Sequence, residues 1–156
     1  SFIMEYKINN SQNIDEREDV KFKTKFKRLN IKVLVAEDNK MNVLILKRFF
    51  TNWGVEATIA QNGQEALEFV KKDNFDIVLM DLQMPIMDGY QATKSIRKLR
   101  NCAKSELPIY ALTAFAQTDI KEKTKIFKMN GFMSKPFDPE RLYKLLKQYS
   151  KSLIEV

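Results

Sequence analysis

The sequence predicts an α/β fold in which a doubly wound, parallel sheet of five strands carries helices on both faces. Three observations support this prediction. Short apolar runs alternate with amphipathic helical stretches five times from about residue 31 onward. The run at 77–80 (IVLM) is apolar throughout, which is typical of a strand covered by helices on both sides. Asn-Gly pairs at 62–63 and 130–131 mark turns between elements.

The predicted strands are short runs of β-branched and other apolar residues. In chain order they are residues 31–36, 56–60, 77–80, 109–113 and 132–134. Pro108 directly precedes the fourth strand.

The predicted helices carry apolar residues at spacings of three or four. In chain order these apolar positions are Met41, Ile45, Phe49 and Trp53; Ala66, Leu67 and Val70; Thr93, Ile96 and Leu99; Ile120, Thr124 and Phe127; and Leu142, Leu145, Leu146 and Tyr149. Gly54 ends the first helix, and Asp138 followed by Pro139 is an N-cap that opens the last one.

We expect three segments along the chain. Residues 1–30 are polar and lack helical periodicity, so they are predicted to be an N-terminal linker that is partly disordered. Residues 31–150 are predicted to form one folded domain, and residues 151–156 a C-terminal tail. Near the end of the linker, four residues alternate with lysines, so an edge or augmenting strand is an alternative there. The alternating positions are Val20, Phe22, Thr24 and Phe26.

Composition excludes several classes of function. The chain has no His, which excludes His-ligated zinc and Ser-His-Asp triads. Its four glycines form neither GxxxxGK[ST] nor GxGxxG, and no apolar run reaches the ~18 residues of a membrane span. Cys102, the single cysteine, has no partner for an internal disulfide. The net charge of +7 indicates solvated lysines on helices rather than a nucleic-acid partner.

Reactive residues follow four of the five predicted strands. Glu37 and Asp38 come directly after the first strand and Asp81 after the third, Thr113 ends the fourth, and Lys135 follows the fifth. Because the carboxyl ends of parallel strands meet at one edge of the sheet, where ligands bind, we expect these side chains to be neighbours.

The chemistry of this set points to phosphoryl transfer. Three crowded carboxylates repel one another unless a cation lies among them, and an all-oxygen ligand set favours Mg²⁺. A carboxylate such as Asp81 can act as a nucleophile toward a phosphoryl group and form an aspartyl phosphate. The Lys135 ammonium would neutralise charge, and the Thr113 hydroxyl would donate a hydrogen bond to a phosphoryl oxygen.

Five ordered motifs resemble those of response-regulator receiver domains. They lie within residues 31–150 and include VLVAEDNKMN, FDIVLMDLQMPIMDGYQAT, IYALTA and GFMSKPF. The DLQMPIMDG version is similar to receivers attached to hybrid sensor kinases. The resemblance implies a flavodoxin-like (βα)5 sheet of strand order 2-1-3-4-5.

The resemblance also implies roles for individual residues. Asp81 matches the phosphoacceptor, Asp38 the direct Mg²⁺ ligand, and Glu37 a carboxylate that acts through metal-bound water. The backbone carbonyl of Gln83 matches the third protein ligand of the metal, and Lys135 the lysine that pairs with the phosphoryl group.

Two further positions match the conformational switch of the family. Thr113 matches the switch hydroxyl and Phe132 the switch aromatic, although ordinary core packing explains Phe132 equally well. The Lys135–Pro136 bond is expected to be cis, as in the family. Phe115 is bulkier than is usual two residues after the switch hydroxyl, and we expect it to shield the acyl phosphate from water.

The expected function is that of a two-component phosphorelay receiver and conformational switch. It would accept a phosphoryl group onto Asp81, in an Mg²⁺-dependent reaction, from a phosphohistidine on a partner kinase or phosphotransfer domain. No output domain is expected after residue 150, so a C-terminal receiver of a hybrid histidine kinase fits best. We expect it to be cytoplasmic, either alone or as the cytoplasmic part of a larger membrane-bound sensor.

Alternative functions remain open. The first is a stand-alone, single-domain response regulator. The second is a phosphatase or mutase with an aspartyl-phosphate intermediate, although Gln83 cannot titrate where such enzymes usually place a second Asp. The third is nucleic-acid binding through the basic linker, which would weaken steeply with salt.

Overall fold

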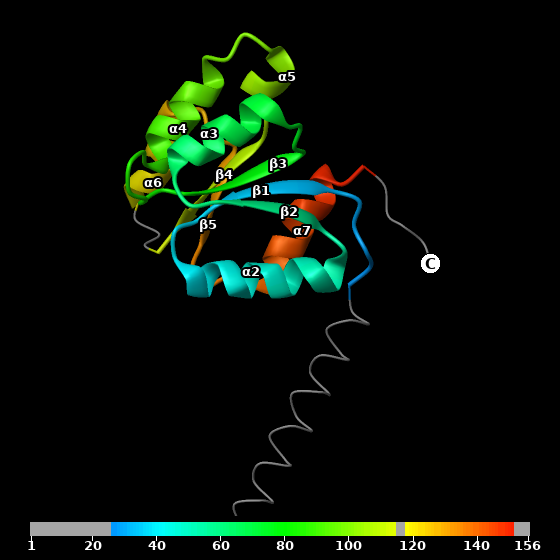
Figure 1. Cartoon of the computed structure of the whole chain (residues 1–156). Helices are drawn as coiled ribbons and strands as arrows, with labels where there is room; N and C mark the ends of the chain where they lie inside the picture. Colours follow the sequence, from blue (N-terminus) through cyan, green and yellow to red (C-terminus); the bar gives the residue numbers. More distant parts are fainter. Residues whose placement is uncertain (1–25, 115–117, 152–156) are drawn as a thin grey trace, which may run out of the picture.

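The computed structural model of the chain describes residues 26–114 and 118–151. A five-stranded parallel sheet of order β2-β1-β3-β4-β5 forms its centre (Figure 1). The strands are β1 (Lys32–Ala36), β2 (Glu56–Ala60), β3 (Ile77–Asp81), β4 (Ile109–Thr113) and β5 (Gly131–Ser134). The helices are α2 (Lys40–Trp53), α3 (Gly63–Lys72), α4 (Gly89–Arg97), α5 (Cys102–Ser105), α6 (Thr118–Ile126) and α7 (Pro139–Tyr149). The predicted fold class and strand order are confirmed.

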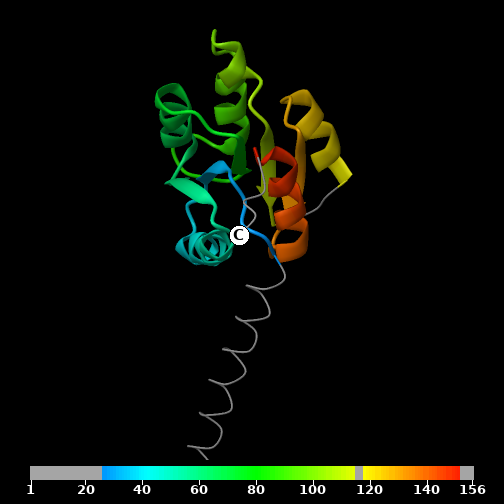
Figure 2. The same cartoon turned by 90° about the vertical axis from the view of Figure 1, so that its right-hand side faces the viewer.

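Helices cover both faces of the sheet (Figures 1 and 2). Alternate residues of β1 enter different cores, because successive side chains of a strand point to opposite faces. Val33 and Val35 belong to the core shared with α2 and α7, whereas Leu34 and Ala36 belong to the core shared with α3 and α4. β3 is buried along its whole length, as its continuous apolar run predicts.

The buried face of α2 differs from the predicted one. The helix and its end at Gly54 are confirmed, with Gly54 in the left-handed region at φ 69°. However, the residues that enter the core are Leu46, Phe50 and Trp53, while Met41 is 65% exposed. A row of residues four apart turns by about 40° at each step, so it spirals away from the sheet over three steps.

The short helix α5 was not predicted. Asn101 caps its first turn by accepting a hydrogen bond from the amide of Ala103 at 3.0 Å. The Arg97 guanidinium ties this turn to the end of α4 by donating to the carbonyl oxygens of Ser105 at 2.9 Å and Leu107 at 2.7 Å. A single turn is too short to give a periodic signal in the sequence.

The last residues of the predicted linker pack against the domain. Leu29 is 1% exposed, and its amide donates to the carbonyl oxygen of Trp53 at 2.8 Å. The aromatic ring of Phe26 contacts Trp53 and Tyr143. Of the possible strand at Val20, Phe22, Thr24 and Phe26, only Phe26 is described, and it does not belong to a strand. The other three positions lie outside the described residues. Within the described parts of the chain, no helix has the length and apolar character needed to cross a membrane.

Candidate functional site

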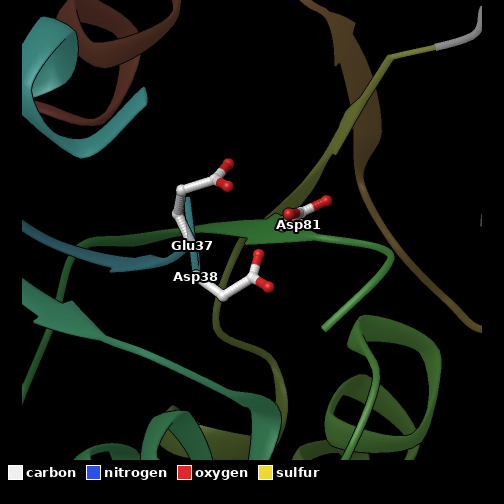
Figure 3. A group of neighbouring side chains, drawn as sticks. All are labelled: Glu37, Asp38 and Asp81. Atoms are coloured by element: carbon white, nitrogen blue, oxygen red, sulfur yellow. The ribbon is translucent and has the colours of Figure 1, made fainter. Parts of the chain in front are cut away.

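Three carboxylates gather at the carboxyl edge of the sheet. Glu37 and Asp38 directly follow β1, and Asp81 ends the neighbouring strand β3 (Figure 3). One carboxylate oxygen from each lies within 4.8 Å of the other two. Glu37 and Asp81 are buried, at 1% and 7% exposure, whereas Asp38 is exposed. The structure therefore brings together the acidic residues that the strand-end argument predicted to be neighbours.

Lys135 joins this cluster from the loop after β5. Its Nζ lies 2.7 Å from Glu37 Oε2 and 3.3 Å from Asp81 Oδ2. The backbone amide of Lys135 donates to the carbonyl oxygen of Thr113 at 2.7 Å, which holds the lysine beside the end of β4. The amide of Asn39 donates to Glu37 Oε1 at 3.1 Å. One ammonium thus bridges two buried carboxylates that would otherwise repel.

The environment of Asp81 disfavours its charged form. Burial, followed by the negative charge of Glu37, raises the pKa of Asp81 from 3.8 to about 6. Lys135 and the backbone amide of Gln83, which donates to Asp81 Oδ1 at 3.3 Å, act in the opposite direction. Because burial and the Glu37 charge outweigh the favourable contacts, added positive charge near Asp81 would stabilise its carboxylate.

The cluster opens into a cavity of about 420 Å³. The residues predicted from strand ends that line it are Glu37, Asp38, Asp81, Thr113 and Lys135, together with Gln83. Sequence reasoning missed further polar lining residues from helix starts, namely Asn39, Asn42, Tyr90, Asp119 and Lys123. The sequence could have indicated them, because the helices that follow β1, β3 and β4 begin at the same edge of the sheet.

Close packing fixes the loop between β3 and α4. A Cβ atom on Gly89 would collide with the backbone carbonyl oxygen of Asp81, so only glycine fits at the start of α4. Asp88 caps α4 in a reciprocal arrangement with Gln91. The loop that carries Gln83 is thereby anchored close behind Asp81.

Phe132 lies away from the cavity lining. It is half-buried on β5, pairs with Ala111 of β4, and packs against the core on the α3 and α4 side of the sheet. This position agrees with ordinary core packing and leaves its switch role a prediction. The Lys135–Pro136 peptide bond is cis, as expected. Phe115 lies outside the described residues.

The fold and the site together define a class of protein: flavodoxin-like α/β domains with an acidic, cation-attracting site at the carboxyl edge of the sheet. A family model narrows this class. Residues 33–147 match the response regulator receiver domain, and the chain belongs to this family. It is therefore a receiver domain of a two-component system.

Relatives and solved structures agree with this assignment. The chain is 39% identical over 120 residues to hybrid signal transduction histidine kinase I of Dictyostelium discoideum. The matched region covers 74% of this chain and 7% of that kinase. It is 31% identical, with a TM-score of 0.70, to the receiver domain of a sensor histidine kinase of Pseudomonas aeruginosa, over 77% of this chain and 97% of that one. That receiver was crystallised with a magnesium ion coordinated in its active-site cleft.

A third similar structure includes a partner. The receiver domain of a Saccharomyces cerevisiae response regulator is 30% identical, with a TM-score of 0.73, over 82% of this chain and 95% of that one. It was co-crystallised with a histidine phosphotransfer signalling protein.

Proposed function

We propose that Asp81 accepts a phosphoryl group from a phosphohistidine on a partner kinase or phosphotransfer domain. The observation that carries this proposal is the contact of Lys135 Nζ with Asp81 at 3.3 Å inside a three-carboxylate cluster that opens into a cavity. Because the sequence has no His, the donor histidine belongs to another domain or another polypeptide. The similar yeast receiver, co-crystallised with a histidine phosphotransfer protein, supports this kind of partner.

The donor set of the site fits Mg²⁺. Among the residues that the structure describes, the cluster consists of three carboxylates, and hard divalent cations prefer such oxygen ligands. Asp38 and Asp81 would hold the ion directly, with the Gln83 carbonyl as a third ligand and Glu37 acting through water. When bound, the ion would supply positive charge that screens an incoming phosphoryl group from the carboxylates.

The site residues have distinct roles in the proposed transfer. A carboxylate oxygen of Asp81 attacks the phosphorus in line, an O–P bond forms, and the P–N bond breaks with its electron pair returning to the histidine ring. Lys135 pairs with the phosphoryl oxygens. The Thr113 hydroxyl donates to one of them, and its inward shift allows Phe132 to repack. The surface of α6, β5 and α7 then changes for partners to bind.

The context that we propose for this receiver is a hybrid histidine kinase, in which it would belong to the cytoplasmic part. Hybrid kinases of Dictyostelium discoideum at 38–41% identity support this context. A stand-alone regulator would act through the same residues.

Acetyl phosphate with Mg²⁺, followed by intact mass, tests the acceptor. We expect the parent chain to gain one phosphoryl group and Asp81→Asn to gain none. Asp119→Asn is a matched control, because Asp119 lines the same cavity outside the carboxylate cluster. Phosphorylation of Asp81→Asn at the parental level would refute the assignment.

A further inference from the structure

Residues 26–30 form a strap across the ends of α2 and α7. The ring centroid of Phe26 lies 5.5 Å from that of Trp53 at the end of α2 and 4.6 Å from that of Tyr143 in α7. Trp53 and Tyr143 also contact each other, at 5.3 Å, so Phe26 completes a three-ring cluster. Aromatic pairs at such distances stabilise beyond the area they bury.

Hydrogen bonds hold the strap on both helices. The hydroxyl of Tyr143 donates to the carbonyl oxygen of Lys27 at 2.9 Å. The amide of Asn30 donates to Ser150 Oγ at 3.1 Å, and the amide of Lys151 donates to the carbonyl oxygen of Asn30 at 3.0 Å. Together with the backbone hydrogen bond from Leu29 to Trp53, these contacts hold the strap along its length.

The strap is linked to the phosphoacceptor site through a short stretch of chain. Lys135 contacts Asp81, and Phe137, two residues further on, is buried in the core that also contains Trp53, Tyr143 and Leu29. α7 begins at Pro139 and carries Tyr143 one turn later. A displacement of Lys135 therefore acts on the core that holds the strap.

We propose that this strap couples the phosphorylation state of Asp81 to the chain that precedes the domain, an inference that rests on the proposed function. Phosphoryl oxygens lie farther out in the cavity than the carboxylate that carries them, so they draw Lys135 outward. Phe137 follows and loosens its packing in the strap's core. By thermodynamic reciprocity, a weakened strap favours binding of a phosphoryl group or its analogue at Asp81.

Amide hydrogen exchange of the full chain tests the coupling without any substitution. We expect acetyl phosphate with Mg²⁺ to accelerate exchange of the Leu29 amide by about fivefold or more relative to Mg²⁺ alone. The Asp73 amide, which donates to the carbonyl oxygen of Phe69 at the end of α3, is the internal control and should stay unchanged. Intact mass of the same sample records the phosphoryl group.

The outcomes separate the two proposals. A chain that gains no phosphoryl group overturns the proposed function and the coupling together. A phosphorylated chain whose Leu29 exchange is unchanged overturns the coupling alone, as does acceleration of Leu29 and Asp73 to the same extent.

The reciprocal effect is measured on Phe26→Leu, which keeps an apolar side chain in the strap. We expect it to bind beryllofluoride, a phosphoryl analogue, about threefold or more tightly in the presence of Mg²⁺. Phe75→Leu is the matched control, because Phe75 is also half-buried but packs on the opposite core. Equal affinities for the parent and Phe26→Leu would count against the coupling.

Discussion

Removing the charge of Asp81 should stabilise the domain. Asp81 lies buried beside the negative Glu37, and these two causes outweigh the favourable contact with Lys135. In Asp81→Asn the repulsion disappears while Lys135 keeps its 2.7 Å contact with Glu37. The variant therefore relieves an electrostatic penalty without leaving the buried Glu37 charge unpaired.

The size and pH dependence of this penalty follow from the pKa shift. Folding raises the pKa of Asp81 from 3.8 to about 6, so the folded state holds the proton more tightly than the unfolded state. Stability consequently falls as the pH rises through this window and is lowest above it. The shift corresponds to at most about 3 kcal/mol of unfolding free energy. The advantage of Asp81→Asn should grow from about 1.5 kcal/mol at pH 5 to about 3 kcal/mol at pH 7.5.

Urea unfolding in a Mg²⁺-free buffer measures this advantage. Trp53, the only tryptophan, is fully buried and reports unfolding by its fluorescence. Asp119→Asn serves as the control for loss of a cavity carboxylate outside the cluster, and we expect it to change stability by less than about 0.5 kcal/mol. An Asp81→Asn variant no more stable than the parent at pH 7.5, or an advantage that does not vary with pH, would refute the electrostatic reasoning.

Three further predictions concern the ion, the lysine and the helix face. Mg²⁺ should raise the melting temperature of the parent with increasing concentration, and Asp38→Asn should abolish most of that increase in a thermal scan. Lys135→Met should lower the unfolding free energy in urea by about 2 kcal/mol or more, because it leaves the buried Glu37 charge unpaired. Leu46→Ala should cost about 2–5 kcal/mol in the same assay, whereas Met41→Ala should cost less than about 0.5 kcal/mol; equal costs would contradict the buried face of α2.

The acidic site was predictable because it depends on topology more than on packing. Once β1 and β3 are recognised as parallel strands, Asp38 and Asp81 must emerge at the same edge of the sheet. The lysine could be added for the same reason, since it follows the last strand. The distances from Lys135 to the two carboxylates could not be predicted, because they depend on the backbone hydrogen bond between Lys135 and Thr113.

The orientation of α2 and the strap were beyond sequence reasoning. Met41 and Leu46 are both apolar, and only contact with the sheet decides which of them is buried. Phe26 ends a short alternation with lysines that indicates at most an edge strand. No local signal shows that its partners are Trp53 and Tyr143, which lie far away in the sequence. Patterns predict elements well where neighbours in sequence are neighbours in space, and fail where the contact is long-range.

The carboxylate cluster lowers the stability of the domain, and packing in the rest of the fold compensates for this cost. Glu37, Asp38 and Asp81 have carboxylate oxygens within 4.8 Å of one another, where their charges repel. The ends of the strands nevertheless hold them together in the folded state. The strands are fixed by two cores that do not depend on these carboxylates. The charged form of Asp81 therefore remains disfavoured in the folded state, and binding of a cation beside it would relieve this penalty. A cluster without this penalty would gain less free energy from binding a cation, so the penalty itself favours binding of the proposed Mg²⁺.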